Sequence, residues 1–213
     1  MARRVVLIAL GCLLLVIGAL AAIAGGALMA LFGSNNTLSS GVQQVSTPTH
    51  ALVSPTGSIQ GASGAQTVFG SVRLHITATP TGAGQQLFLG IGPASAVDHY
   101  LSGVSYDVAT NVSVDPFHLT LARQPGTATP PLPDSQSFWV ANASGNHPTL
   151  TWTVTSGSYR VVVMNTDAAA PVAFAGGLDL TIPHLFGIGI GLLVGGIVLI
   201  AIAIVLIVLG ART

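Results

Sequence analysis

Two long apolar runs frame the chain, and a more polar region lies between them. The first run extends from Val5 to Phe32 and the second from Leu185 to Gly210, and neither contains a charged residue. About 20 apolar residues, each rising ~1.5 Å along a helix, cross a hydrocarbon core ~30 Å thick. The pattern therefore predicts two transmembrane helices, over residues 5–32 and 185–210.

Between the two runs, apolar and polar residues alternate with a period of two, which is typical of half-buried β-strands. Thr and Val are frequent in these stretches, and both suit a pleated sheet. Many short strands separated by turn residues predict a mainly-β, β-sandwich-like domain over residues 51–182. The predicted strands are residues 72–79, 86–91, 103–108, 117–121, 137–141, 150–154, 159–165 and 178–182.

Several segments between these strands have a composition of their own. Residues 33–50 are rich in Ser, Thr, Asn and Gln, which predicts a flexible polar linker. Residues 93–101 predict a short helix capped by Ser95. Residues 124–134 contain four prolines and predict an exposed loop, and residues 155–158 predict a hairpin loop.

Charged residues are scarce in this chain. It contains six Arg and six Asp, with no Lys and no Glu, which is 6% of its residues. Soluble domains average about 25%, so the deficit favours a protein partly immersed in lipid. The net charge is zero and no basic patch is visible, so nucleic acid is not an expected partner. The single cysteine, Cys12, lies in the first apolar run, so no disulfide is expected.

The charges that flank the two runs predict an orientation. Arg3 and Arg4 precede the first run, and Arg212 follows the second. Cationic flanks stay in the cytoplasm, so we expect residues 1–4 and 211–213 inside a bacterial inner membrane and the central domain outside it. A cleaved signal peptide is the alternative for the first run, although signal peptides have a shorter apolar core of ~7–15 residues.

Both apolar runs carry small residues at four-residue spacing. This spacing puts small side chains on one face of a helix, where another helix can approach closely. The sequence leaves open whether the two helices pack on each other or assemble into a homo-oligomer, and Gly is also simply common in membrane helices. The helix-packing candidates are Gly18, Ala22 and Gly26 in the first run and Gly187, Gly191 and Gly195 in the second.

The residues available for catalysis are few. The central domain has no Glu, Lys or Cys, and no two of the six histidines stand at a short metal-ligand spacing. Ser63, within Gly61-Ala62-Ser63-Gly64-Ala65, is similar to a nucleophile elbow, but that motif requires a helix after the serine, and a loop is expected here. Gly90-Ile91-Gly92 lacks the third glycine of a dinucleotide fingerprint. We therefore expect no metal, no cofactor and no enzymatic activity.

Trp139 is the one candidate for an exposed binding contact. Neighbouring residues on a strand point to opposite faces. If Phe138 and Val140 face the core, Trp139 faces outward, where it would contact a sugar, a lipid headgroup or a protein. Alternatively, the proline-rich loop before it folds over the ring.

Five segments resemble a known group of proteins. They are FLGIGPASAVDHYL (88–101), VDPF (114–117), SFWVA (137–141), RVVVMNTD (160–167) and PHLFGIGIGLLVGG (183–196). The group comprises actinobacterial membrane proteins with a helix, an outer β-domain and a second helix. The resemblance implies an actinobacterial source and supports the same topology, and it implies no catalytic or binding residues.

Two functions are consistent with these features. The first is a non-enzymatic cell-envelope binding or scaffold protein that acts through its outer β-domain. The second is an accessory subunit of a membrane transporter or envelope-synthesis complex, assembled through the Gly-rich helices. The expected partners are the lipid bilayer and either a second copy of the chain or another membrane protein.

Overall fold

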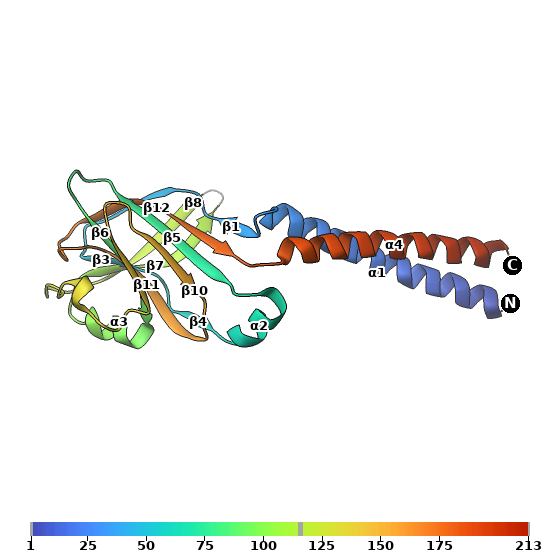
Figure 1. The fold of residues 1–213 in the computed structure, drawn as a ribbon, viewed down its shortest axis with the longest axis horizontal. Helices are drawn as coiled ribbons and strands as arrows, with labels where there is room; N and C mark the ends of the chain where they lie inside the picture. The colour runs from blue at the N-terminus through green and yellow to red at the C-terminus, as the bar shows by residue number, and fades with distance from the viewer. Residues whose placement is uncertain (1, 115–116, 213) are drawn as a thin grey trace. The chain divides into compact units, whose positions relative to one another are not determined.

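The computed structural model describes residues 2–114 and 117–212, which form two compact units (Figure 1). The helix pair comprises Met1–Leu38 and Ile182–Thr213, and the β-domain comprises Ser39–Thr181. Asp115 and Pro116, in the middle of the VDPF motif, lie outside the described residues, as do Met1 and Thr213. The side chains of Phe117 and His118, which the alternation assigns to a strand, are also outside the description.

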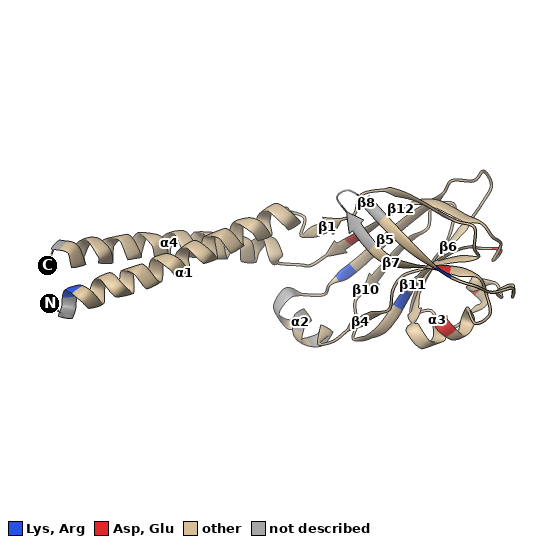
Figure 2. Cartoon of the chain, turned by 180° about the vertical axis from the view of Figure 1, so that it is seen from behind, with Lys and Arg blue, Asp and Glu red and all other residues tan. Residues whose placement is uncertain are grey.

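The helix pair consists of α1 (Ala2–Phe32) and α4 (Leu185–Arg212). The stretches Arg4–Phe32 and Leu185–Ala211 have mean hydropathies of 3.0 and 3.4, and both are long enough to cross a membrane. Figure 2 shows charge on this pair only near the N-terminal end of α1, among the residues that it colours. Two terminal apolar helices that flank a mainly-β domain are the predicted fold class, which the structure confirms.

Asn36 joins the two helices where α1 ends and α4 begins. Its side-chain Oδ1 accepts the N–H of Phe186 at 2.7 Å, and its carbonyl accepts the N–H of Ile182 at 2.9 Å. The first turn of a helix has N–H groups without helical partners, so this amide caps α4. Asn36 has φ +55°, a left-handed conformation that asparagine adopts more readily than most residues.

The β-domain is built from two sheets. In the first sheet, β12 lies between β5 and the pair β1 and β2, and β10 pairs with the other edge of β5. The second sheet has the order β8-β7-β3-β11-β6-β9, with β4 also paired to β11. The first sheet contains β1 (Thr37–Ser39), β2 (Gln43–Thr47), β5 (Arg73–Pro80), β10 (Thr149–Thr153) and β12 (Val172–Thr181). The second contains β3 (Ala51–Val53), β4 (Gly57–Ile59), β6 (Leu87–Pro93), β7 (Tyr106–Val114), β8 (Phe117–Gln124), β9 (Ala141–Gly145) and β11 (Gly157–Asn165).

The centre of the second sheet is buried on both faces. On β6, Leu87, Leu89 and Ile91 belong to an apolar cluster shared with the first sheet, whereas Phe88 belongs to a second cluster on the opposite face. This second cluster includes residues of α3 (Ala94–Tyr100). A strand that is covered on both faces has a nearly continuous apolar sequence, and β6 has such a sequence. The β-domain therefore has a sandwich core and an additional covered face.

The polar segment 33–50 is not a flexible linker throughout. Strand β2 lies within it and pairs with β12 from Thr47–Val172 to Gln43–Gly176. Thr47 and Thr49 are buried, so the β-domain begins near Ser39 rather than at Ala51. A polar composition is compatible with an edge strand because one face of such a strand contacts solvent.

Other local predictions were wrong in detail. Of the predicted strand 137–141, only Ala141 lies in a strand, because Ser137 and Phe138 form a turn and Trp139 follows that turn before β9. Residues 155–158 do not close a hairpin, since β10 and β11 belong to different sheets. The short helix is confirmed as α3, but Ser95 lies inside it, after an N-cap at Pro93.

Residues 124–134 are a loop up to Leu132, as expected, with a 3-10 turn, η1, over Pro133–Ser135. The expected loop around Ser63 is instead helix α2 (Ala62–Phe69).

Candidate functional site

The two terminal helices touch backbone to backbone through small residues. A Cβ added at Gly25 would lie 2.5 Å from the carbonyl oxygen of Gly189, and one added at Gly196 would lie 2.6 Å from the carbonyl oxygen of Gly18. A Cβ at Gly11 would lie 3.0 Å from the carbonyl oxygen of Ala203. No side chain larger than hydrogen fits at such distances, so the absence of Cβ atoms is what allows this approach.

The small residues at this interface recur every seven residues on both helices. Seven residues are close to two helical turns, so such a repeat keeps one face of a helix against its neighbour. The two helices run in opposite directions, and each glycine of α1 meets a small residue of α4 in reverse order. The repeat consists of Gly11, Gly18 and Gly25 on α1 and Gly189, Gly196, Ala203 and Gly210 on α4.

The six predicted packing residues divide into two groups. Gly18 and Ala22 lie against Gly196 at the α1–α4 interface. At the other four positions, an added Cβ would meet no atom of the described residues within 4 Å, so these positions do not join the two helices of one chain. Their role in packing against another chain stays a prediction. The four are Gly26, Gly187, Gly191 and Gly195.

Trp139 is not an exposed contact. Its side chain is 9% exposed, and its indole N–H donates to the carbonyl oxygen of Pro133 at 2.9 Å. The alternative, that the proline-rich loop folds over the ring, is therefore confirmed. The prediction of an exposed ring failed because it assumed a strand at residues 137–141, whereas a turn sends the ring inward.

Glycines of β6 provide the surface on which these rings lie. A Cβ at Gly90 would lie 2.6 Å from Phe88 and 2.8 Å from Trp139, and one at Gly92 would lie 3.1 Å from Phe138. Gly90-Ile91-Gly92 is thus a packing feature rather than a nucleotide-binding loop. Tyr100 joins the same cluster, and burial raises its pKa to about 12.

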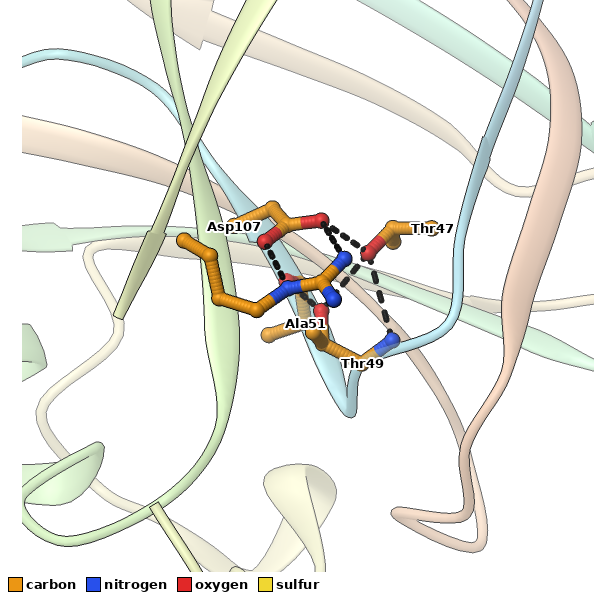
Figure 3. Close-up of polar contacts among 5 residues, drawn as sticks. Thr47, Thr49, Ala51 and Asp107 are labelled. Atoms are coloured by element: carbon orange, nitrogen blue, oxygen red, sulfur yellow. Dashed lines mark hydrogen bonds and ion pairs between the residues drawn. The ribbon is translucent and has the colours of Figure 1, made fainter. Parts of the chain in front are cut away.

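A buried polar network joins the end of β2 and the residues that follow it to strands β7 and β8 (Figure 3). Asp107 on β7 is 2% exposed and accepts hydrogen bonds from Arg123 Nε at 3.0 Å and Nη2 at 3.2 Å. The Thr47 hydroxyl donates to Asp107 Oδ2 at 2.6 Å. The hydrogen bond from Arg123 holds the pKa of the Asp107 carboxyl below its usual value, although burial by itself would raise it. The hydrogen bond from Thr47 and the Coulombic attraction of Arg123 lower the pKa as well.

The ionised state of Asp107 orders the hydroxyl groups beside it. Because a carboxylate only accepts, the single hydrogen of the Thr47 hydroxyl must point to Asp107. Thr49 Oγ1 lies 2.7 Å from Thr47 Oγ1 and 3.0 Å from the carbonyl oxygen of Ala51. The Thr49 hydroxyl hydrogen is therefore shared between these two acceptors. The network fixes the β2–β3 connection, which is a structural role.

The remaining candidate residues form no metal centre. Among residues 2–114 and 117–212, no group of three or more His, Cys, Asp or Glu residues could hold a metal ion. Ser63 is the second residue of α2, not the residue of a strand-to-helix turn that a nucleophile elbow needs.

One row across the first sheet does combine three reactive groups. His75 on β5 pairs with Thr151 on β10 and with Asp179 on β12. His75 Nδ1 lies 2.9 Å from the Thr151 hydroxyl oxygen. A hydroxyl, an imidazole and a carboxylate in one row are the groups of a hydrolytic triad, and sequence reasoning missed them because they are far apart along the chain.

Comparisons with known proteins establish no family. No family model matches the chain, and no curated protein matches its sequence. The mitogen derived from Yersinia pseudotuberculosis matches at 10% identity and a TM-score of 0.24, over 70% of this chain and 86% of that chain. CorA, a surface-associated copper-binding protein important in Methylomicrobium album BG8 copper acquisition, matches at 15% identity and a TM-score of 0.29, over 71% of this chain and 96% of that one. Scores this low carry no functional argument.

Proposed function

We propose that this chain is a non-enzymatic binding or scaffold protein of a bacterial cell envelope. Its helix pair anchors it in the inner membrane with both termini in the cytoplasm, and its β-domain binds an envelope component outside. The lipid bilayer is then the first partner of the chain.

The observation that carries the proposal is the apolar outer surface of the helix pair. Leu20 and Ile23 on α1 are 63% and 70% exposed, and Val205 on α4 is 57% exposed. The closest backbone contacts between the helices are made at glycine and alanine, and many of the larger apolar side chains stay exposed on the outside of the pair. Such a surface is unfavourable in water and favourable in lipid.

Four aspartates of the β-domain support a non-enzymatic role. Asp98 pairs with Arg160, Asp107 with Arg123, Asp134 with the Ser144 hydroxyl, and Asp167 with the N–H of Ala169. These carboxylates are used in holding the fold. Catalytic carboxylates instead face a cleft with a tuned protonation state.

The competing function is an accessory subunit of a transporter or envelope-synthesis complex. A specific observation favours it: Gly187, Gly191 and Gly195 lie on a part of α4 that does not contact α1. Four-residue glycine spacing permits a second close helix contact. In this case the partner would be a membrane helix rather than an envelope component.

Site-specific photo-crosslinking in native membranes tests the two functions against each other. A benzoylphenylalanine is placed at Thr151 or Leu132 in the β-domain, or at Val194 on α4, all of which are exposed. Adducts from the β-domain positions support the envelope protein. A stoichiometric adduct from Val194 to another membrane protein, with none from the β-domain, supports the accessory subunit.

Three further results would contradict the proposal. Release of the full chain from membranes by alkaline carbonate would remove the anchor. A mature protein beginning near Leu31 would lack α1, so the helix pair and the cytoplasmic N-terminus would be absent. Hydrolysis of p-nitrophenyl acetate that disappears in the Thr151→Val variant would show that the row of His75, Thr151 and Asp179 is catalytic.

A further inference from the structure

A polar pocket of about 290 Å³ lies at one end of the β-domain. Its walls come from the β5–β6 connection, which supplies Gly84, Gln85 and Gln86, and from Asn165 and the β11–β12 connection that follows it. Strand β12 begins beside this pocket at Val172 and ends ten residues later at Thr181. At ~3.3 Å per residue, the pocket is roughly 30 Å along β12 from the point where the chain leaves the β-domain.

The wall after β11 is held in one conformation by its own hydrogen bonds. The Asn165 side-chain amide donates to the carbonyl oxygens of Ala169 at 2.8 Å and Pro171 at 2.9 Å. Asp167 Oδ1 accepts the N–H of Ala169 at 3.0 Å, and the carbonyl oxygen of Ala168 accepts a hydrogen from His50 Nδ1 at 2.8 Å. A wall held in this way loses little entropy when a ligand binds.

One acceptor in this wall lacks a donor among the described residues. Asn165 is 4% exposed, and its Oδ1 is buried without a hydrogen-bond partner there. The orientation of the amide is determined, because its NH₂ group faces two carbonyl oxygens and only an NH₂ can donate to both. Oδ1 itself has less than 1 Å² of accessible surface, so a ligand would contact the exposed groups of the wall rather than this atom.

The remaining wall groups define the class of ligand. Gln85, Gln86 and Thr166 offer neutral donors and acceptors, and Asp167 is the single charged residue of the lining. A negative wall disfavours phosphates and carboxylates. One carboxylate is also too few for a calcium site, which takes 6–8 oxygen ligands that usually include several carboxylates.

We propose that this pocket binds one neutral sugar unit of an envelope glycan. Sugar hydroxyls both donate and accept, which matches a wall of amides, a hydroxyl and a carboxylate. The volume lies just below the roughly 300–1,000 Å³ found for ligand pockets, which suits a single unit. This inference rests on the proposed function and names the ligand class of the β-domain.

The test is saturation-transfer NMR with the full chain in lipid nanodiscs, because maltoside and glucoside detergents carry sugar head groups. The probes are the methyl glycosides of glucose, galactose and mannose. We expect saturation transfer to at least one probe with the natural chain. Ala169→Trp fills the pocket and should weaken binding at least tenfold, and Gln86→Ala should weaken it severalfold if Ala169→Trp fails to fold.

The matched control is Thr153→Trp, which adds the same ring at the other end of the first sheet, where Thr153 pairs with Arg73. It should leave binding unchanged. Absence of saturation transfer to every probe, equal signals in Ala169→Trp and the natural chain, or displacement of the glycoside by calcium or inorganic phosphate would overturn the sugar site. Those results leave crosslinking from Thr151 or Leu132 unaffected, so failure of the sugar site and failure of the envelope function are distinguishable.

Discussion

The helix pair and the β-domain use glycine in opposite ways. In the helix pair, Gly18 and Gly196 bring two backbones together, and many large apolar side chains are exposed on the outside. In the β-domain, Gly90 lies beneath the rings of Phe88 and Trp139, and the large apolar side chains point inward. The first arrangement leaves apolar side chains exposed, as suits an apolar solvent, and the second buries them away from water.

The difference shows which interactions stabilise each region. Burying an aromatic side chain removes a large apolar area from water, at about 25 cal/mol per Å². Within lipid this driving force is absent between helices, so close van der Waals contact takes its place. A substitution that enlarges a side chain should therefore harm the helix pair, whereas one that shortens a side chain should harm the β-domain.

The largest effect is expected from Trp139→Ala. Removing a buried indole and its hydrogen bond to Pro133 should lower the free energy of unfolding by about 4 kcal/mol. Urea unfolding of the full chain in nanodiscs, followed by the fluorescence of Trp152, measures this. Val140→Ala, at the adjacent residue that is 46% exposed, should cost less than about 0.5 kcal/mol. Equal effects of the two substitutions would contradict a buried Trp139.

Gly196→Leu should produce the next largest effect, in the helix pair. A Cβ at this position meets the Gly18 carbonyl oxygen and the Ala22 backbone nitrogen, each at 2.6 Å. Overpacking of this kind costs about 3 kcal/mol. The control is Gly195→Leu, where an added Cβ meets no described atom within 4 Å. A thermal melt of the full chain in nanodiscs compares the two. If Gly195→Leu is the more harmful variant, the seven-residue repeat is not the interface.

Asp107→Asn should lower the stability of the β-domain by about 2 kcal/mol at pH 7, because the hydrogen bonds from Arg123 and Thr47 lose a charged acceptor. The pKa of Asp107 is lowered on folding, so its contribution is present above about pH 4 and is lost as the pH falls through the folded pKa. Urea unfolding at a series of pH values should show this acid-sensitive loss in the natural chain and not in the variant. Thr47→Val should lower the free energy of unfolding by about 1 kcal/mol, and this variant should still lose stability at acid pH.

Asn36→Ala should have the smallest effect, about 1 kcal/mol, through loss of the cap on α4 and through the left-handed φ of +55°, which alanine adopts less readily than asparagine. Asn35→Ala provides the control, because it changes the neighbouring asparagine. Amide exchange at Phe186 reports the result directly, since this N–H donates to Asn36. Faster exchange is expected in Asn36→Ala and not in Asn35→Ala, and unchanged exchange in both would contradict the cap.

The spacing of apolar residues predicted much of the fold, because an element that is buried on one face has apolar residues at regular intervals along the chain. Strands such as β5 and β11, helix α3 and both terminal helices follow from it. Residues 137–141 were misread because Phe138 and Trp139 favour strands, whereas their burial comes from a turn beneath a proline-rich loop. Strand β2 was missed because an edge strand needs few apolar residues, and its partner β12 is more than 100 residues away.

The helix interface was partly readable. Gly187, Gly191 and Gly195 stand out at a familiar four-residue spacing, yet the structure uses the seven-residue repeat that includes Gly189 and Gly196. Both patterns are present in the same sequence, and only the position of α1 distinguishes them. The Asp107 network and the polar pocket were not readable, since each joins residues that are distant along the chain.

The seven-residue repeat also restricts how the length of the helix pair can change. Inserting one residue between Gly18 and Gly25 would rotate the rest of α1 by about 100° and turn every later glycine away from α4. Only a block of seven, added to both helices, would preserve the match, and it would lengthen the pair by about 10 Å. Adaptation to a thicker or thinner bilayer would thus occur in discrete steps or by tilting of the intact pair.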